Sequence, residues 1–152
     1  MQIKRQDSLT ASTGLAERLI QAFHRATYRI TWAGKPSLDL HVDERSDDLA
    51  ALLADAGVSR AAIITGHNPY GQLRAADNPG YEDALRRYLD NGGDHYLETE
   101  HITHPDDSWP CERGVLVFGL SPERARLVGT IFGQYAVLTI GPDSTPRLLF
   151  LS

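Results

Sequence analysis

The feature that most constrains the fold is the order of six periodic segments that begins at residue 61. They are predicted as strand, helix, strand, strand, helix and strand, with strands at 61–65, 95–101, 114–119 and 135–140 and helices that open at 78 and 121. Two successive strands between two helices are typical of the split βαβ, ferredoxin-like arrangement. A doubly wound parallel sheet is the alternative, but parallel neighbours need a crossover helix between them. The sequence therefore predicts an α+β fold with a ferredoxin-like core.

Further elements extend this core at both ends. Residues 14–25 place apolar side chains on one helical face, and residues 27–32 and 37–42 are predicted as a β-hairpin. A second helix follows and ends at Gly57, and residues 147–151 are predicted as a last strand. We expect one domain over residues 1–152, with residues 1–12 as a flexible N-terminus.

Helix starts can be predicted from side-chain chemistry. Ser46 or Asp47 is expected to cap the second helix, because short polar side chains accept hydrogen bonds from the free N–H groups of the first turn. Asn78-Pro79 and Ser121-Pro122 both place a capping residue before a proline at the first helical position. Asn78 is therefore predicted as an N-cap.

Composition and charge narrow the partners. The chain has 152 residues, with 15 Lys and Arg against 20 Asp and Glu, for a formal net charge of −5. An acidic surface disfavours nonspecific binding to nucleic acid and to anionic lipid. A single cysteine, no secretory signal and no long apolar run indicate a cytoplasmic protein without a membrane partner.

Three connections are expected to meet at one edge of the sheet. If strand 61–65 runs upward, the segments 65–78, 102–113 and 133–135 all lie at the top. The first two are about a dozen residues each, well above the usual median of about 4–6. Long loops in small domains are often functional, and ligands tend to bind beyond the carboxyl ends of strands.

These connections supply the candidate site residues. His67 or Glu112 is the predicted acid or base, because imidazole and carboxylate are the groups that exchange protons near neutral pH. The predicted ligand-binding residues are those that offer hydrogen bonds or a stacking face at the same edge: Thr65, Asn68, Tyr70, Asn78, Trp109 and Gln134. We expect Glu112 and Gln134 to meet near Thr65 and Asn68, within about 10 Å, which is two strand spacings.

Each candidate also has a purely structural interpretation. Thr65 and Asn68 can satisfy backbone groups at a strand end, and Trp109 can anchor its loop. Glu112 and Gln134 can satisfy each other or a loop backbone. Cys111 is predicted as a small packed thiol, because the sequence shows no activating base.

The sequence motifs give little support for a metal or cofactor site. His101 and His104 are three residues apart with carboxylates nearby, but this spacing gathers ligands on a helix rather than at a strand end. The sequence contains no phosphate-binding loop, dinucleotide fingerprint, nucleophile elbow or zinc motif. We therefore predict no metal and no cofactor, and whether the protein is an enzyme stays open.

Several short segments, taken in their order along the chain, resemble a known family. Those that carry the resemblance are Ala26-Thr27-Tyr28-Arg29, Thr65-Gly66-His67-Asn68-Pro69, Asp77-Asn78, Trp109-Pro110-Cys111-Glu112 and Phe132-Gly133-Gln134-Tyr135-Ala136. Together they are similar to the bacterial domain-of-unknown-function family 3293. The family pattern has Thr-Ala-aromatic-Asn-Pro at 65–69 and often Gln-Asn-Ala at 134–136. The resemblance implies a bacterial or phage source and no particular activity.

Two functions remain in view. The first is the binding of a small polar ligand at the loop edge. The alternative is a non-catalytic protein-interaction or inhibitor module that acts through an acidic surface. The leucine-rich strand 147–151 would support a homodimer if it lies at a sheet edge.

Overall fold

The computed structural model describes residues 17–32 and 34–151, and the predicted flexible segment 1–12 lies outside them. Residues 17–25 are helical, as expected for the described part of 14–25. The other elements are β1 (Thr27–Thr31), β2 (Leu38–Leu40), α2 (Asp47–Asp55), β3 (Ala61–Thr65), the 3-10 turn η1 (Pro69–Gly71), α3 (Asn78–Asn91), β4 (Tyr96–Ile102), β5 (Glu112–Phe118), α4 (Pro122–Ile131), β6 (Ala136–Ile140) and β7 (Pro146–Phe150). None of the helices in these ranges is long and apolar enough to cross a membrane.

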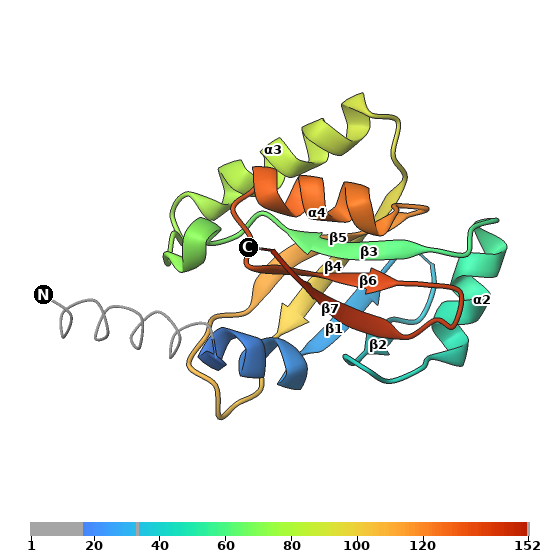
Figure 1. The fold of residues 1–152 in the computed structure, drawn as a ribbon, viewed down its shortest axis with the longest axis horizontal. Coiled ribbons are helices and arrows are strands. Elements are labelled where there is room, and N and C mark those ends of the chain that lie inside the picture. Colours follow the sequence, from blue (N-terminus) through green and yellow to red (C-terminus); the bar gives the residue numbers. More distant parts are fainter. Residues whose placement is uncertain (1–16, 33, 152) are drawn as a thin grey trace, which may run out of the picture.

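Seven strands form one antiparallel sheet in the order β2-β1-β4-β5-β3-β6-β7. The α+β prediction is confirmed, and the antiparallel pairing excludes the doubly wound alternative. Within the predicted core the order is β4-β5-β3-β6, with α3 and α4 on the same side of the sheet (Figure 1). Assignment of this unit to the ferredoxin-like class stays a prediction.

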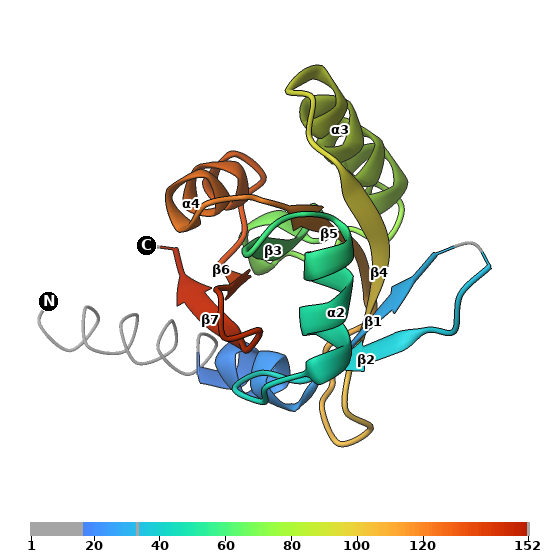
Figure 2. The ribbon, with the colours of Figure 1, turned by 90° about the vertical axis from the view of Figure 1, so that its right-hand side faces the viewer.

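Both faces of the sheet are apolar at the interior strand β3, which is covered on each side. All five residues of β3 are buried. Ala62 and Ile64 pack with Leu85 and Leu89 of α3 and with Val128 of α4. On the opposite face, Ile63 belongs to a second cluster that includes Leu49 and Leu53 of α2. Figure 2 shows the sheet curled around α2.

The curl brings the two ends of the sheet together. The segment between β2 and α2 donates one hydrogen bond to the first residue of β7, from Asp43 N to Pro146 O (2.7 Å), and one to the turn before it, from Ser46 N to Ser144 O (3.1 Å). These bonds satisfy part of the exposed edge of β7.

Two of the three predicted helix caps are confirmed. The side chain of Ser46 accepts a hydrogen bond from Leu49 N (3.1 Å), and that of Ser121 accepts one from Arg124 N (3.2 Å). The prediction for Asn78 is wrong. Asp77 precedes α3 without a side-chain capping bond, and the Asn78 amide turns toward the loop after β3. The Asn78 side chain bonds to Asn68 of the distant loop in place of the free N–H groups at the start of its own helix.

Candidate functional site

The strand register brings the predicted loops to one edge of the sheet. Thr65, at the end of β3, lies opposite Gly114 of β5, and His101, near the end of β4, lies opposite Glu112. β5 begins at Glu112, two residues earlier than predicted, so this carboxylate is part of the ladder. The side chains of Thr65, His101 and Glu112 are all buried.

The loop after β3 is organised by two asparagines. Asn78 Oδ1 accepts a hydrogen bond from Asn68 N (2.9 Å), and Asn78 Nδ2 donates to Asn68 Oδ1 (3.1 Å). Asn68 Oδ1 also accepts from Arg74 N (2.8 Å). Asn68 Nδ2 donates to Glu112 Oε2 (2.8 Å), so one asparagine links the loop, α3 and β5.

The backbone of this loop is strained at two positions. Asn68 has φ 50° and Tyr70 has φ 59°, in the left-handed region that asparagine tolerates better than tyrosine. Tyr70 is held there because its N–H donates to Gly133 O (2.7 Å) and its carbonyl accepts from Tyr135 Oη (3.0 Å). Such conformations persist where surrounding contacts determine them, and they concentrate at functional loops.

Glu112 is the most unusual group of the site. Its side chain is 5% exposed, and its hydrogen-bond partner is the amide of Asn68. Burial raises the pKa of Glu112 to about 7, although the Asn68 amide and the nearby Trp109 indole act in the opposite direction. Trp109 Nε1 itself is buried and makes no hydrogen bond within the described part of the chain. The carboxyl group is therefore poised to exchange a proton near neutral pH.

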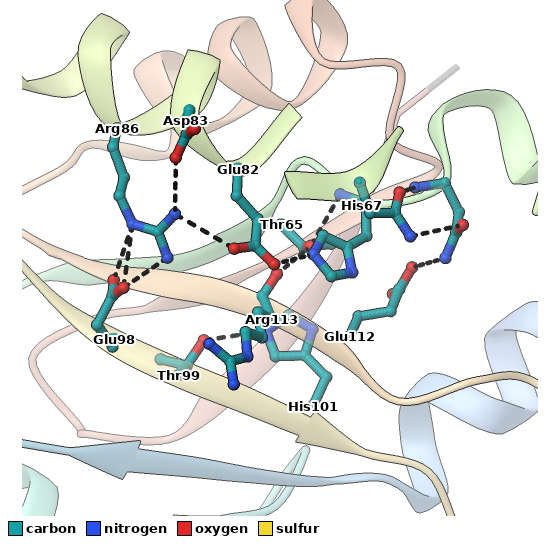
Figure 3. A network of polar contacts seen from close by, with 12 residues as sticks. Thr65, His67, Glu82, Asp83, Arg86, Glu98, Thr99, His101, Glu112 and Arg113 are labelled. Carbon is teal, nitrogen blue, oxygen red and sulfur yellow. Dashed lines mark hydrogen bonds and ion pairs between the residues drawn. The ribbon is translucent and has the colours of Figure 1, made fainter. Parts of the chain in front are cut away.

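His67 lies beside this carboxyl group and is also buried. Its backbone N–H donates to Thr65 Oγ1 (3.0 Å), and its ring Nε2 is hydrogen-bonded to Glu82 of α3. In the view of Figure 3 the His67 ring lies between Glu82 and Glu112. Its Nδ1 is buried and has no hydrogen-bond partner among the described residues.

A small cavity joins most of these groups. Its volume is about 10 Å³, the lower limit for one water molecule. It is lined by the polar residues His67, Asn68, Trp109, Glu112 and Gln134, and by Leu19, Phe23, Gly71, Gly133 and Tyr135. Leu19 and Phe23 belong to the helix 17–25, which closes this end of the sheet.

Some of the predicted site residues line the cavity, whereas others bond to the backbone or lie outside it. Glu112 and Gln134 line the same cavity, but they do not bond to each other, because Gln134 Nε2 donates to the carbonyls of His67 and Phe132 (3.1 Å each). Thr65 bonds to the backbone, since its hydroxyl donates to Arg113 O (2.5 Å). Asn78 holds Asn68 in place through two hydrogen bonds. The Tyr70 side chain is 68% exposed and does not line the cavity.

Cys111 and the pair His101 and His104 lie close to the site in sequence. The prediction that Cys111 is packed is wrong: it is exposed, and its Sγ accepts a long hydrogen bond from Thr103 N (3.4 Å). In residues 17–32 and 34–151, no group of three His, Cys, Asp or Glu side chains is arranged to hold a metal ion, and His101 and His104 have separate partners.

Residues outside the predicted acid, base and ligand-binding set complete the site. Glu82 is 17% exposed and contacts His67, and Arg86 links Glu82 to Glu98 of β4. His101 packs over Gly114, and burial is the main cause that lowers its pKa to about 3, with a smaller contribution from His67. The spacing of Asn78, Glu82 and Arg86 by four residues on one helix was the available signal.

Comparison with known proteins adds a family and no activity. A family model matches residues 64–137, which contain all of the polar cluster, and it is described as protein of unknown function (DUF3293). No match was found among curated proteins or among solved structures.

Proposed function

Since the family model that matches residues 64–137 carries no activity in its description, we propose from the geometry that the protein binds a small polar ligand at this edge of its sheet. Glu112 and His67 are the acid and base groups of the proposed site. One observation carries the proposal: the buried carboxyl of Glu112 shares a cavity with His67 and Trp109, each of which has a buried polar atom without a partner in residues 17–32 and 34–151.

The energetics favour a functional role over a structural one. Burial of a carboxylate without full pairing costs several kcal/mol, and a glutamine would keep the same shape without a charge. A buried donor or acceptor without a partner costs about 1–3 kcal/mol. Groups kept at such a cost, with a pKa near neutrality, are typical of sites that bind or transform a ligand.

An outer groove provides a route to these groups. It has a volume of about 370 Å³ and runs between the helix 17–25 and the loop after β4, next to Asp106 and Asp107. Leu19 and Trp109 line both the groove and the inner cavity. Movement of these two side chains would connect the groove to Glu112, so a ligand of a few non-hydrogen atoms fits the proposal.

A thermal-shift screen against nucleotides, amino acids and metal ions tests the proposal, because a ligand that binds only the folded state raises its melting temperature. The screen should use the wild type, Glu112→Gln and the control Glu100→Gln, which removes an exposed carboxylate of β4. We expect a ligand that stabilises the wild type and the control but not Glu112→Gln. An equal response of all three variants would contradict the proposal.

A second candidate is a protein-interaction module. Tyr70 and Leu73 lie on the same loop with 68% and 65% of their surfaces exposed, and Phe150 of β7 is 48% exposed. Exposed apolar groups of this kind occur at interaction sites. Binding of a protein partner that is abolished by Leu73→Ser and unchanged by Glu112→Gln would favour this candidate over the first.

A further inference from the structure

A chain of charged groups reaches His67 from the surface. Arg86 Nη2 donates to Glu98 Oε1 (2.5 Å), and Arg86 Nη1 donates to Glu82 Oε2 (3.4 Å). The other oxygen of Glu82 is bonded to His67 Nε2. Figure 3 shows the four side chains in this sequence, from β4 across α3 to the loop after β3. The Glu82 carboxylate is therefore held in place from one side and acts on the imidazole from the other.

This arrangement determines which nitrogen of His67 carries the proton. A carboxylate only accepts hydrogen bonds, so Nε2 must be the protonated nitrogen. In the neutral ring, Nδ1 is then an acceptor. His67 Nδ1 is buried and has no hydrogen-bond partner among the described residues, so in this tautomer it is an acceptor that lacks a donor.

We propose that Glu82 is a positioning residue that holds His67 as the Nε2–H tautomer, so that Nδ1 is the acceptor that the site presents to a hydroxyl or amide N–H of the ligand. This inference rests on the proposed function, and it adds the ligand class and the role of α3. Ligands that carry only acceptors, such as sulfate or the dianion of a phosphate monoester, lack the donor that Nδ1 requires.

The charged groups around His67 favour an uncharged ligand that donates a hydrogen bond to Nδ1. Glu82 faces the ring from α3 and is paired with Arg86, His101 faces it from β4, and Glu112 lies across the cavity on β5. Burial lowers the pKa of His101 to about 3, so this ring is neutral at pH 7. The Glu112 carboxylate would repel an anionic ligand, and none of the groups named here is a free cation that could offset this repulsion. A hydroxyl or amide ligand is uncharged and is not repelled.

Nitrogen-15 NMR of the imidazole rings tests the tautomer without a ligand, because long-range correlations distinguish the two neutral forms and the imidazolium. We expect the Nε2–H form for His67 in the wild type at pH 7.5. Glu82→Gln keeps an acceptor oxygen and should keep this tautomer, whereas Glu82→Ala should lose it. Asp83→Ala, which removes an exposed carboxylate from the same helix, is the matched control and should change nothing. An Nδ1–H ring or an imidazolium in the wild type would overturn the inference.

Acetamide and N,N-dimethylacetamide test the ligand class, since they share a carbonyl and differ in the N–H donor. Acetamide should shift the His67 Nδ1 resonance, and N,N-dimethylacetamide should not. Binding of acetamide should weaken about three- to tenfold in Glu82→Ala, as expected for loss of one positioned hydrogen bond. An equal response to both amides, or none to either, would overturn the ligand class. Failure of the proposed function is recognised separately, by a ligand response in the thermal-shift screen that Glu112→Gln leaves unchanged.

Discussion

Asn78, the first residue of α3, exchanges two hydrogen bonds with Asn68 of the loop after β3, and Asn68 in turn holds the carboxyl of Glu112. The two asparagines thus join a helix start to a buried acid on a distant strand. Since both are buried, their hydrogen bonds are made in a medium where an unpaired group is costly.

Replacement of Asn78 by alanine should destabilise the protein through the loop and not through the helix. The change leaves the buried N–H of Asn68 without its acceptor, and we expect a loss of about 2–3 kcal/mol in the free energy of unfolding. Asp77→Ala is the matched control. Its side chain makes no capping bond, so it should cost less than about 0.5 kcal/mol. Urea unfolding measures both, and equal losses would contradict this account.

Protonation of Glu112 should make stability depend on pH. Its pKa is about 7 in the folded protein against 4.5 as the unperturbed value, so the folded state binds more protons between these limits. The contribution of Glu112 is therefore fully present below about pH 4.5 and is lost as the pH rises to about 7, with a total of about 3 kcal/mol.

His101 acts in the opposite direction. Its pKa is lowered from 6.5 to about 3, so the unfolded state binds more protons in that range, and its contribution is lost as the pH falls. The two slopes oppose each other between about pH 4.5 and 6.5. The wild-type profile should therefore be flat there, whereas Glu112→Gln should show stability that rises with pH across this range. Urea unfolding at several pH values measures both profiles, and parallel profiles would contradict the assignment.

Gly114 should not accept a side chain. A Cβ at this position would lie 2.5 Å from Ile64 O and 2.8 Å from His101 Nε2. Gly114→Ala should therefore displace His101 or the β3 backbone and destabilise the protein by about 3 kcal/mol. Gly80→Ala in α3 meets no atom within 4 Å and should stabilise the helix by up to about 1 kcal/mol. Thermal denaturation of the two variants should show shifts of opposite sign.

Self-association would proceed through β7, which lies at an edge of the sheet. The segment before α2 covers the beginning of this strand, and Phe150 near its end is 48% exposed. We predict a weak homodimer that Phe150→Lys abolishes, because charge on an edge strand opposes pairing. Sedimentation equilibrium at increasing concentration measures this. A wild type that stays monomeric at every concentration would remove the prediction.

Much of the architecture could be predicted from the sequence because it depends on local patterns. The apolar run Ala61–Thr65 forms the buried interior strand β3, and Ser121-Pro122 begins α4 as its capping chemistry predicted. The order of strands and helices then places the ends of β3 and β4 and the beginning of β5 at one edge, because alternation of direction follows from the connections. The convergence of Asn68, Glu112 and Gln134 on one cavity follows from this order.

Only the tertiary structure decided how the side chains at that edge are used. Asn78 has the composition of a helix cap, yet it bonds to Asn68, because a buried partner from the folded loop competes with the local N–H groups. Glu82 looks like an ordinary exposed helix residue in sequence, and it becomes part of the site because α3 packs its face against His67. Hydrophobic periodicity determines which face of an element is buried. Which polar groups meet across elements depends on rotamers, register and packing between segments far apart in the chain, and no local pattern encodes these.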